Sequence, residues 1–226
     1  MIHIYAIGSG SAKAYLVGGR GGWILIDSGV PVLGKRLVGK IAAVLSSPRD
    51  LRLAVLTHVH YDHAGGLAGV VRAFGCPVMV SALEAETLAA GLMPIPDGRT
   101  PWTRFAADLG RRHPALANRL MRYEAVSPCV AIDSETSLAP YGVNAVALPT
   151  PGHTAGSISI LTGDGHAFVG DLAYNIPFMR RPDRTPIFAN DPARVLESRA
   201  LLLARGARVI HPGHGPAFSS AFFESR

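Results

Sequence analysis

The stretch LTHVHYDHAGG, residues 56–66, decides how the rest of the chain is interpreted. It places His58, His60, Asp62 and His63 within six consecutive positions. His58 and His60 are two residues apart, so in an extended segment both side chains point to the same side. Neutral imidazole and carboxylate suit zinc, and four such groups exceed what one catalytic zinc usually takes from a single segment. The stretch therefore predicts a pair of neighbouring metal ions.

Three further residues offer ligands at comparable places. His153 follows an expected strand at 143–149, Asp171 follows one at 166–170, and His214 follows one at 207–210. Each lies in or beside a turn with glycine, which lets the backbone approach a ligand closely. Because strand ends on one edge of a sheet converge, these residues can meet the histidine-rich stretch in space.

Apolar runs and helical patterns alternate along the chain. Branched and aromatic residues predict strands at 3–8, 14–19, 23–27, 51–58, 77–80, 136–140, 143–149, 157–163, 166–170 and 207–210. Helical spacing and capping residues predict helices at 31–47, 64–75, 81–91 and 191–206. This alternation is typical of a layered α/β architecture.

The length of 226 residues fits one domain, and 48% apolar residues suffice for a substantial core. We therefore expect a single domain over residues 1–226. Residues 91–128 mix prolines with one or two short helices and are too few to bury a core of their own. We interpret them as an insertion, which could form a lid over the site or a dimer contact.

Composition excludes several classes of protein. The sequence has no apolar run of the roughly 20 residues that span a bilayer, and its start lacks the pattern of a secretory signal. Its two cysteines are too few for a disulfide framework, so we expect a reduced, cytoplasmic setting. The net charge of +6 comes mostly from scattered arginines. We expect a small-molecule substrate, no nucleic acid and no membrane as partners, and a monomer or homodimer.

Five motifs in order resemble the metallo-β-lactamase-fold hydrolase superfamily. They are ILIDSG (24–29), THVHYDHAGG (57–66), TPGHTAGS (150–157), GD (170–171) and PGHG (212–215), and they extend over nearly the whole chain. The resemblance implies a four-layer αββα sandwich with a two-metal site at the sheet edges. Zinc is the expected metal, with iron or manganese as alternatives.

The resemblance also implies a role for each candidate ligand. His58, His60 and His153 would hold the first metal, and Asp62, His63 and His214 the second. Asp171 would bridge the two metals. Asp27 would not bind a metal itself but would support the ligands of the histidine-rich stretch. The family pattern favours His214 over His211, which lies three residues earlier.

Tyr174 lies three residues after Asp171, the spacing at which acyl-homoserine lactonases of this superfamily carry a tyrosine that donates a hydrogen bond to the substrate. An alternative is a core aromatic packed beneath the site. Asp62 is a second catalytic candidate, which could orient the nucleophile and move a proton to the leaving group. These residues predict hydrolysis of an ester or lactone by a hydroxide that bridges two metals.

Three other functions stay open. One is a thioesterase similar to hydroxyacylglutathione hydrolases, and one is a small-molecule phosphodiesterase. The phosphodiesterase is supported only by Arg180, Arg181 and Arg184, which could bind an acidic substrate group or simply lie in a solvated loop. The third is a persulfide dioxygenase with a single iron, which the complete second set of ligands weakens.

Overall fold

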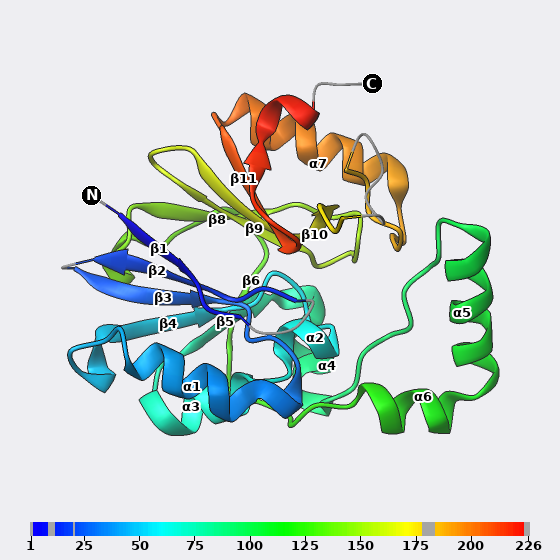
Figure 1. Cartoon of the computed structure of the whole chain (residues 1–226), viewed down its shortest axis with the longest axis horizontal. Coiled ribbons are helices and arrows are strands. Elements are labelled where there is room, and N and C mark those ends of the chain that lie inside the picture. Colours follow the sequence, from blue (N-terminus) through cyan, green and yellow to red (C-terminus); the bar gives the residue numbers. More distant parts are fainter. Residues whose placement is uncertain (1, 9–11, 20, 178–183, 224–226) are drawn as a thin grey trace.

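Two six-stranded sheets pack face to face in the computed structural model, which describes residues 2–8, 12–19, 21–177 and 184–223 (Figure 1). The first sheet has the order β1-β2-β3-β4-β5-β6. Its strands are β1 (His3–Ala6), β2 (Tyr15–Gly19), β3 (Gly22–Ile26), β4 (Leu51–Val55), β5 (Val78–Ser81) and β6 (Val130–Ile132). β2 runs antiparallel to both β1 and β3, and β3, β4, β5 and β6 run parallel to one another.

The second sheet has the order β12-β11-β10-β9-β8-β7. Its strands are β7 (Thr136–Ser137), β8 (Ala145–Pro149), β9 (Ile158–Thr162), β10 (His166–Tyr174), β11 (Val209–His214) and β12 (Phe218–Ser219). Neighbouring strands are antiparallel except β10 and β11, which run parallel.

Helices form the two outer layers (Figure 1). The α-helices are α1 (Gly34–Ala42), α2 (Tyr61–Ala64), α3 (Leu67–Phe74), α4 (Ala85–Ala90), α5 (Pro101–Arg112), α6 (Pro114–Met121) and α7 (Pro192–Ala204). Short 3₁₀ turns are η1 (Pro31–Leu33), η2 (Pro48–Asp50), η3 (Ala82–Glu84), η4 (Ala139–Tyr141) and η5 (Ser220–Phe223). In Figure 1, α1 and α3 cover the first sheet, α7 covers the second, and α5 and α6 stand at one edge of the molecule. No helix in the described ranges has the length and apolar character that a bilayer crossing requires.

Strand alternation explains the layers, because successive residues point to opposite faces of a sheet. Val17 and Ile24 belong to the core between the sheets, where Phe168 of the second sheet packs with them. Their neighbours Leu16 and Leu25 belong instead to the core beneath α1 and α3. All five side chains are at most 1% exposed, and burying each contributes about 1.5–3 kcal/mol relative to exposure. The shared core between the sheets joins both halves into a single domain.

The predicted αββα sandwich is confirmed, with local differences. The predicted strand at 136–140 is only two residues long, because Pro140 lacks the N–H that a strand needs and the chain turns into η4. The helix predicted over 81–91 begins as the 3₁₀ turn η3 after Ser81. The edge strand β6 was missed, because its three residues carry too short a pattern.

One edge of the sandwich collects the polar residues that follow strands. Asp27 follows β3 and His58 follows β4, which run parallel. From the second sheet, Asp171 lies within β10 and His214 ends β11, also a parallel pair. Because parallel strands end at the same sheet edge, the fold brings these side chains to one place.

Candidate metal centre

All seven predicted ligands gather at this edge in three overlapping groups. Within each group the potential ligand atoms lie within 4.8 Å of one another. The groups are His58, His60 and His153; His58, His63 and Asp171; and Asp62, His63 and His214. The first and third groups match the two predicted metal sites, and Asp171 lies between them.

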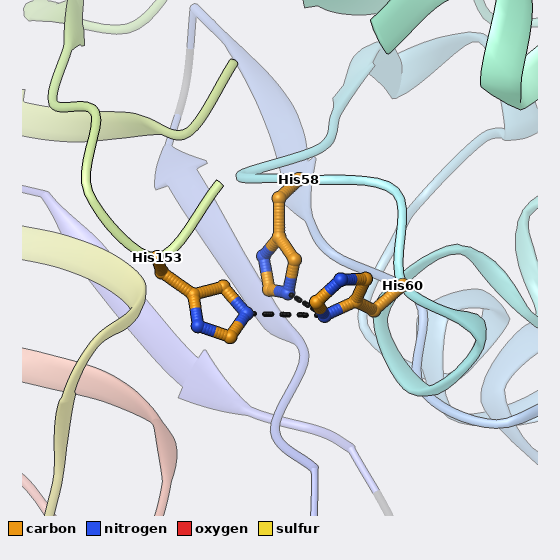
Figure 2. A group of neighbouring side chains, drawn as sticks. All are labelled: His58, His60 and His153. Carbon is orange, nitrogen blue, oxygen red and sulfur yellow. Dashed lines mark hydrogen bonds between the residues drawn. The ribbon is translucent and has the colours of Figure 1, made fainter. Parts of the chain in front are cut away.

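The first group is a cluster of three buried imidazoles (Figure 2). His58 Nε2 lies 3.1 Å from His60 Nδ1, and His153 Nε2 lies 3.0 Å from the same atom. Burial, followed by the neighbouring imidazoles, lowers the pKa of His58 well below its ordinary value and lowers that of His60 to about 3. Burial also lowers the pKa of His153. These rings are therefore neutral near pH 7, the form in which imidazole binds a metal ion.

Hydrogen bonds behind the cluster fix which nitrogen faces inward. His153 Nδ1 donates to the carbonyl oxygen of Phe188 at 2.9 Å, which leaves Nε2 pointing at His60. His58 Nδ1 lies 3.1 Å from the hydroxyl of Thr57 and likewise directs Nε2 into the cluster. Such bonds to the outer nitrogen orient the histidine ligands of metal sites.

The other group mixes imidazoles with carboxylates. His214 Nε2 lies 3.4 Å from both Asp62 Oδ2 and Asp171 Oδ1, and His63 Nε2 lies 3.2 Å from Asp171 Oδ1. Burial opposes protonation of both imidazoles, but the carboxylates outweigh it. Asp171 and Asp62 raise the pKa of His214 to about 10, and Asp171 and Asp27 raise that of His63 well above its ordinary value. This half of the cluster therefore attracts positive charge.

Asp27 supports His63 from behind, at the position that the resemblance implied. His63 Nδ1 donates to Asp27 Oδ2 at 2.9 Å, and the same carboxylate accepts from the backbone N–H and the hydroxyl of Thr57, each at 2.8 Å. Asp27 has a φ of 58°, a left-handed conformation that costs a non-glycine residue about 1–2 kcal/mol. The three hydrogen bonds hold the residue in this conformation.

The donor set fits divalent cations. His63 Nε2 and Asp171 Oδ1 are buried and face each other at 3.2 Å without the geometry of a hydrogen bond, although buried polar atoms are nearly always paired. Both residues belong to the groups of potential metal ligands. Imidazole nitrogen with carboxylate oxygen is the set that zinc and other transition metals take. The cluster is thus compatible with divalent metal binding, and the identity of the metal stays a prediction.

Tyr174 borders the cluster. Its hydroxyl donates to Asp171 Oδ2 at 2.6 Å, and its ring lies 5.0 Å from that of His214. Burial and the adjacent Asp171 hold the pKa of the phenol well above its ordinary value, so the hydroxyl keeps its proton. Tyr174 is therefore buried with its hydroxyl at the centre, and donation to a substrate stays a prediction.

A pocket of about 420 Å³ opens onto the cluster. His60, Asp62, His153, Asp171, Tyr174 and His214 form its polar end. The other walls are almost entirely apolar and come from the insertion and from the segment before α7: Met93, Ile95, Pro96, Ala106, Ala107, Gly110, Met121, Ile176, Ile187 and Phe188, with Tyr61 beside Asp62. Residues of the insertion thus form one wall of the pocket, and its role as a lid or as a dimer contact stays a prediction.

A sequence model described as the Metallo-beta-lactamase superfamily matches residues 7–214. The chain belongs to this superfamily. A probable metallo-hydrolase of Methanocaldococcus jannaschii is 28% identical over 207 residues, covering 91% of this chain and 88% of the relative. A human acyl-coenzyme A thioesterase is 27% identical over 226 residues, covering 92% of this chain and 75% of the relative. An archaeal superfamily structure from Sulfolobus tokodaii, 17% identical, covers 99% of this chain and 83% of its own with a TM-score of 0.67, which supports the fold.

Some residues that the sequence singled out lie outside the metal centre of this metallo-beta-lactamase superfamily member. His211 pairs with His166, their ring nitrogens 2.9 Å apart, and stacks on Phe168, in keeping with the preference for His214. Arg184 is buried, and its guanidinium lies 4.5 Å from the centre of the Phe222 ring. The solvated-loop interpretation is therefore wrong for Arg184, which also does not line the pocket. Arg180 and Arg181 lie outside the described residues.

Sequence reasoning missed Glu84, which follows β5 beside Asp27 and His58 at the same sheet edge. Its buried carboxylate accepts from the backbone N–H of Val59 at 2.6 Å and from the hydroxyl of Thr154. Burial raises the pKa of Glu84, and the two hydrogen bonds, which lower it, only partly offset this rise. Val59 separates His58 from His60, and Thr154 follows His153. Glu84 therefore connects the two loops that form the first group, and its place after a third parallel strand was the available signal.

Proposed function

We propose that this metallo-hydrolase cleaves a carboxylic ester or lactone that carries an apolar acyl group. The observation that carries the proposal is the pocket, which has polar groups at one end and apolar walls elsewhere. Its volume of about 420 Å³ lies within the range of small-molecule sites. A reacting carbonyl would lie at the metal centre, with the acyl chain against Met93, Ile95 and Phe188.

The ligands would be His58, His60 and His153 for one cation and Asp62, His63 and His214 for the other, with Asp171 shared. Divalent cations there would supply Lewis acidity and activate water for attack at neutral pH. The protein contributes a neutral phenol at Tyr174, which can turn from Asp171 to donate to the oxygen that gains charge. Such a donor typically contributes a factor of about 100–1,000 in rate.

Asp62 is suited to proton transfer. Its side chain lines the pocket and retains 18% exposure, more than the fully enclosed Asp171 at 4%. Although burial opposes ionisation, His214 and His63 lower its pKa, so Asp62 is a carboxylate near neutral pH. It can accept a proton from the attacking water and deliver it to the leaving alkoxide, as a general base and acid.

Thioester hydrolysis is the second candidate, and the human acyl-coenzyme A thioesterase at 27% identity favours it. The same acyl pocket and carbonyl chemistry would serve both bonds. A phosphodiester substrate has less support, because no arginine or lysine is among the described residues that line the pocket. Persulfide oxidation at a single iron is also less supported, because all three members of the second group are present and close together.

One substrate panel tests the proposal. Freshly purified protein is analysed for metal content and then assayed on a lactone, an open-chain ester and a thioester that share one apolar acyl group, with a phosphodiester as control. We expect about two metal ions per chain and the highest kcat/KM on the ester or lactone. A higher kcat/KM on the thioester would favour the second candidate. One iron with oxygen-dependent activity, or activity confined to the phosphodiester, would refute both.

A further inference from the structure

The insertion carries its bulkiest apolar side chains on the outside of the molecule. α5 exposes Trp102, Phe105 and Leu109, and α6 exposes Leu116 and Leu120. Trp102 is 73% exposed and Phe105 is 60% exposed, and their ring centroids lie 5.9 Å apart. Both helices stand at the edge of the molecule in Figure 1. We call these five residues the outer apolar face.

This arrangement inverts the usual amphipathic helix, which buries its large apolar residues. The small residues of α5 line the pocket instead: the buried Ala107, the half-buried Gly110 and the exposed Ala106. Trp102, Phe105 and Leu109 are spaced three and four residues apart and so form one stripe. An exposed apolar stripe of this kind marks a surface that meets a partner.

The positive charge of the insertion indicates which kind of partner fits this face. Residues 91–128 contain six arginines and three acidic residues, a net charge of +3. Two of the acidic residues, Asp97 and Asp108, both lie within ion-pair distance of Arg111. Arg112 follows Leu109 by three residues and Arg119 follows Leu116 by three, so each lies beside an apolar stripe.

These charges count against a second copy of the chain. A two-fold contact would place the basic face against itself, and like charges in an interface oppose association. A nucleic acid matches the charge but offers bases that stack on aromatic rings, whereas Leu109, Leu116 and Leu120 are aliphatic. An anionic lipid surface matches both the charge and the apolar side chains.

We propose that the outer apolar face docks on an anionic membrane surface. Trp102 and Phe105 enter the boundary between headgroups and acyl chains, where amphipathic helices bury their apolar face to about 5–10 Å. Arg112 and Arg119 meet the anionic headgroups. This proposal replaces the expectation from the sequence that no membrane is a partner.

Docking would also place the pocket close to the lipid. α5 would have the bilayer on its outer side, while its inner side lines the pocket. An acyl substrate dissolved in the membrane would then reach the pocket by passing the edge of the insertion. This step rests on the proposed function, whereas the docking itself does not.

Vesicle flotation of the full chain tests the docking. We expect binding to phosphatidylcholine vesicles with about 30% phosphatidylglycerol, little binding to phosphatidylcholine alone, and weaker binding at high salt. Arg112→Gln combined with Arg119→Gln should lower the partition coefficient about 25-fold, roughly fivefold for each arginine. Trp102→Ser combined with Phe105→Ser should lower it at least about tenfold.

Matched variants in η1 and α1, outside the insertion, control for exposure and charge. Val32→Ala removes an apolar side chain that is 85% exposed, and Arg36→Gln removes an exposed arginine of α1. Both should bind vesicles as the wild type does. In a Trp23→Phe chain, Trp102 is the sole tryptophan, and its emission should shift to the blue with anionic vesicles only.

Several results would overturn the docking proposal. They are no vesicle binding, equal binding to neutral vesicles, or face variants that bind as the wild type does. A dimer by light scattering that Trp102→Ser with Phe105→Ser converts into a monomer would assign the face to a second copy instead. Circular dichroism verifies that each variant is folded. Loss of esterase activity in the substrate panel would leave the vesicle result unchanged, so the two proposals fail separately.

Discussion

Glu84→Ala would separate the two loops that carry the first histidine group. The substitution leaves the buried N–H of Val59 without its acceptor, which costs about 1–3 kcal/mol. It also removes one buried methylene group, whose burial contributes about 0.8 kcal/mol. Thr154 keeps a partner, because Ser157 Oγ lies 2.8 Å from its hydroxyl. We therefore expect a loss of about 2–4 kcal/mol in the free energy of unfolding, and a fall in Tm of about 4–16 °C.

Metal affinity separates a positioning role from a purely structural one. Removing a residue that orients metal ligands typically lowers affinity about 10–100-fold. We expect this loss for one of two zinc ions in a competition titration with a chromogenic chelator, because Glu84 contacts the loops of His58, His60 and His153 only. Glu84→Gln should restore most of the affinity, since its amide oxygen can still accept from Val59.

Glu86→Ala is the matched control, because Glu86 lies two residues further on and is exposed. It should change neither Tm nor zinc affinity measurably. If Glu84→Ala lowers Tm as expected while both zinc affinities stay within twofold of the wild type, the positioning argument is refuted. Equal weakening of both zinc ions would also refute it, because it would indicate general loosening of the fold.

Three further outcomes are expected. Tyr174→Phe should lower kcat on the ester or lactone about 100-fold with unchanged metal content, and an unchanged kcat would remove the donor role. Dialysis against a chelator should abolish hydrolysis and lower Tm, because a ligand at 100 times its Kd adds about 2.7 kcal/mol to the free energy of unfolding. If added zinc leaves the Tm of the dialysed protein unchanged, the result would count against a metal centre. Gly170→Ala should destabilise the fold by several kcal/mol, because its φ is 50° and a Cβ would lie 2.3 Å from Thr57 Oγ1. Gly29→Ala, with a φ of 68° but open space around it, should cost only about 1–2 kcal/mol in thermal unfolding, and equal costs would contradict the steric explanation.

Short-range patterns predicted a layered α/β architecture and the convergence of the seven clustered residues, whereas the four-layer sandwich was implied by the family resemblance. Strand alternation assigns each apolar side chain to a layer, and ligands such as His58 and His214 lie where strands end. Parallel neighbours then bring those ends together without further information. The family resemblance implied the role of Asp27, because ILIDSG matches the family's acidic residue after an early strand.

The burial and the contacts of Glu84 and Arg184 could not be predicted, because their neighbours come from distant parts of the chain. Glu84 looks like an ordinary acid near a helix start, yet its partner Thr154 lies 70 residues away. Arg184 looks like a loop cation, yet Phe222 supplies the ring above its guanidinium. A buried charged residue is defined by such partners, and composition near it in the sequence carries no record of them.

The insertion shows the same limit more sharply. Its apolar residues are plain in the sequence, but periodicity alone suggests that Trp102, Phe105 and Leu109 form the buried stripe of α5. The structure reverses this assignment, because the small residues Ala106 and Gly110 face the pocket and leave room for it. A helix that turned its large side chains inward would fill the space where a substrate must lie. Keeping the pocket open therefore leaves the bulky stripe on the outer surface, and that stripe is the physical reason to expect a partner there.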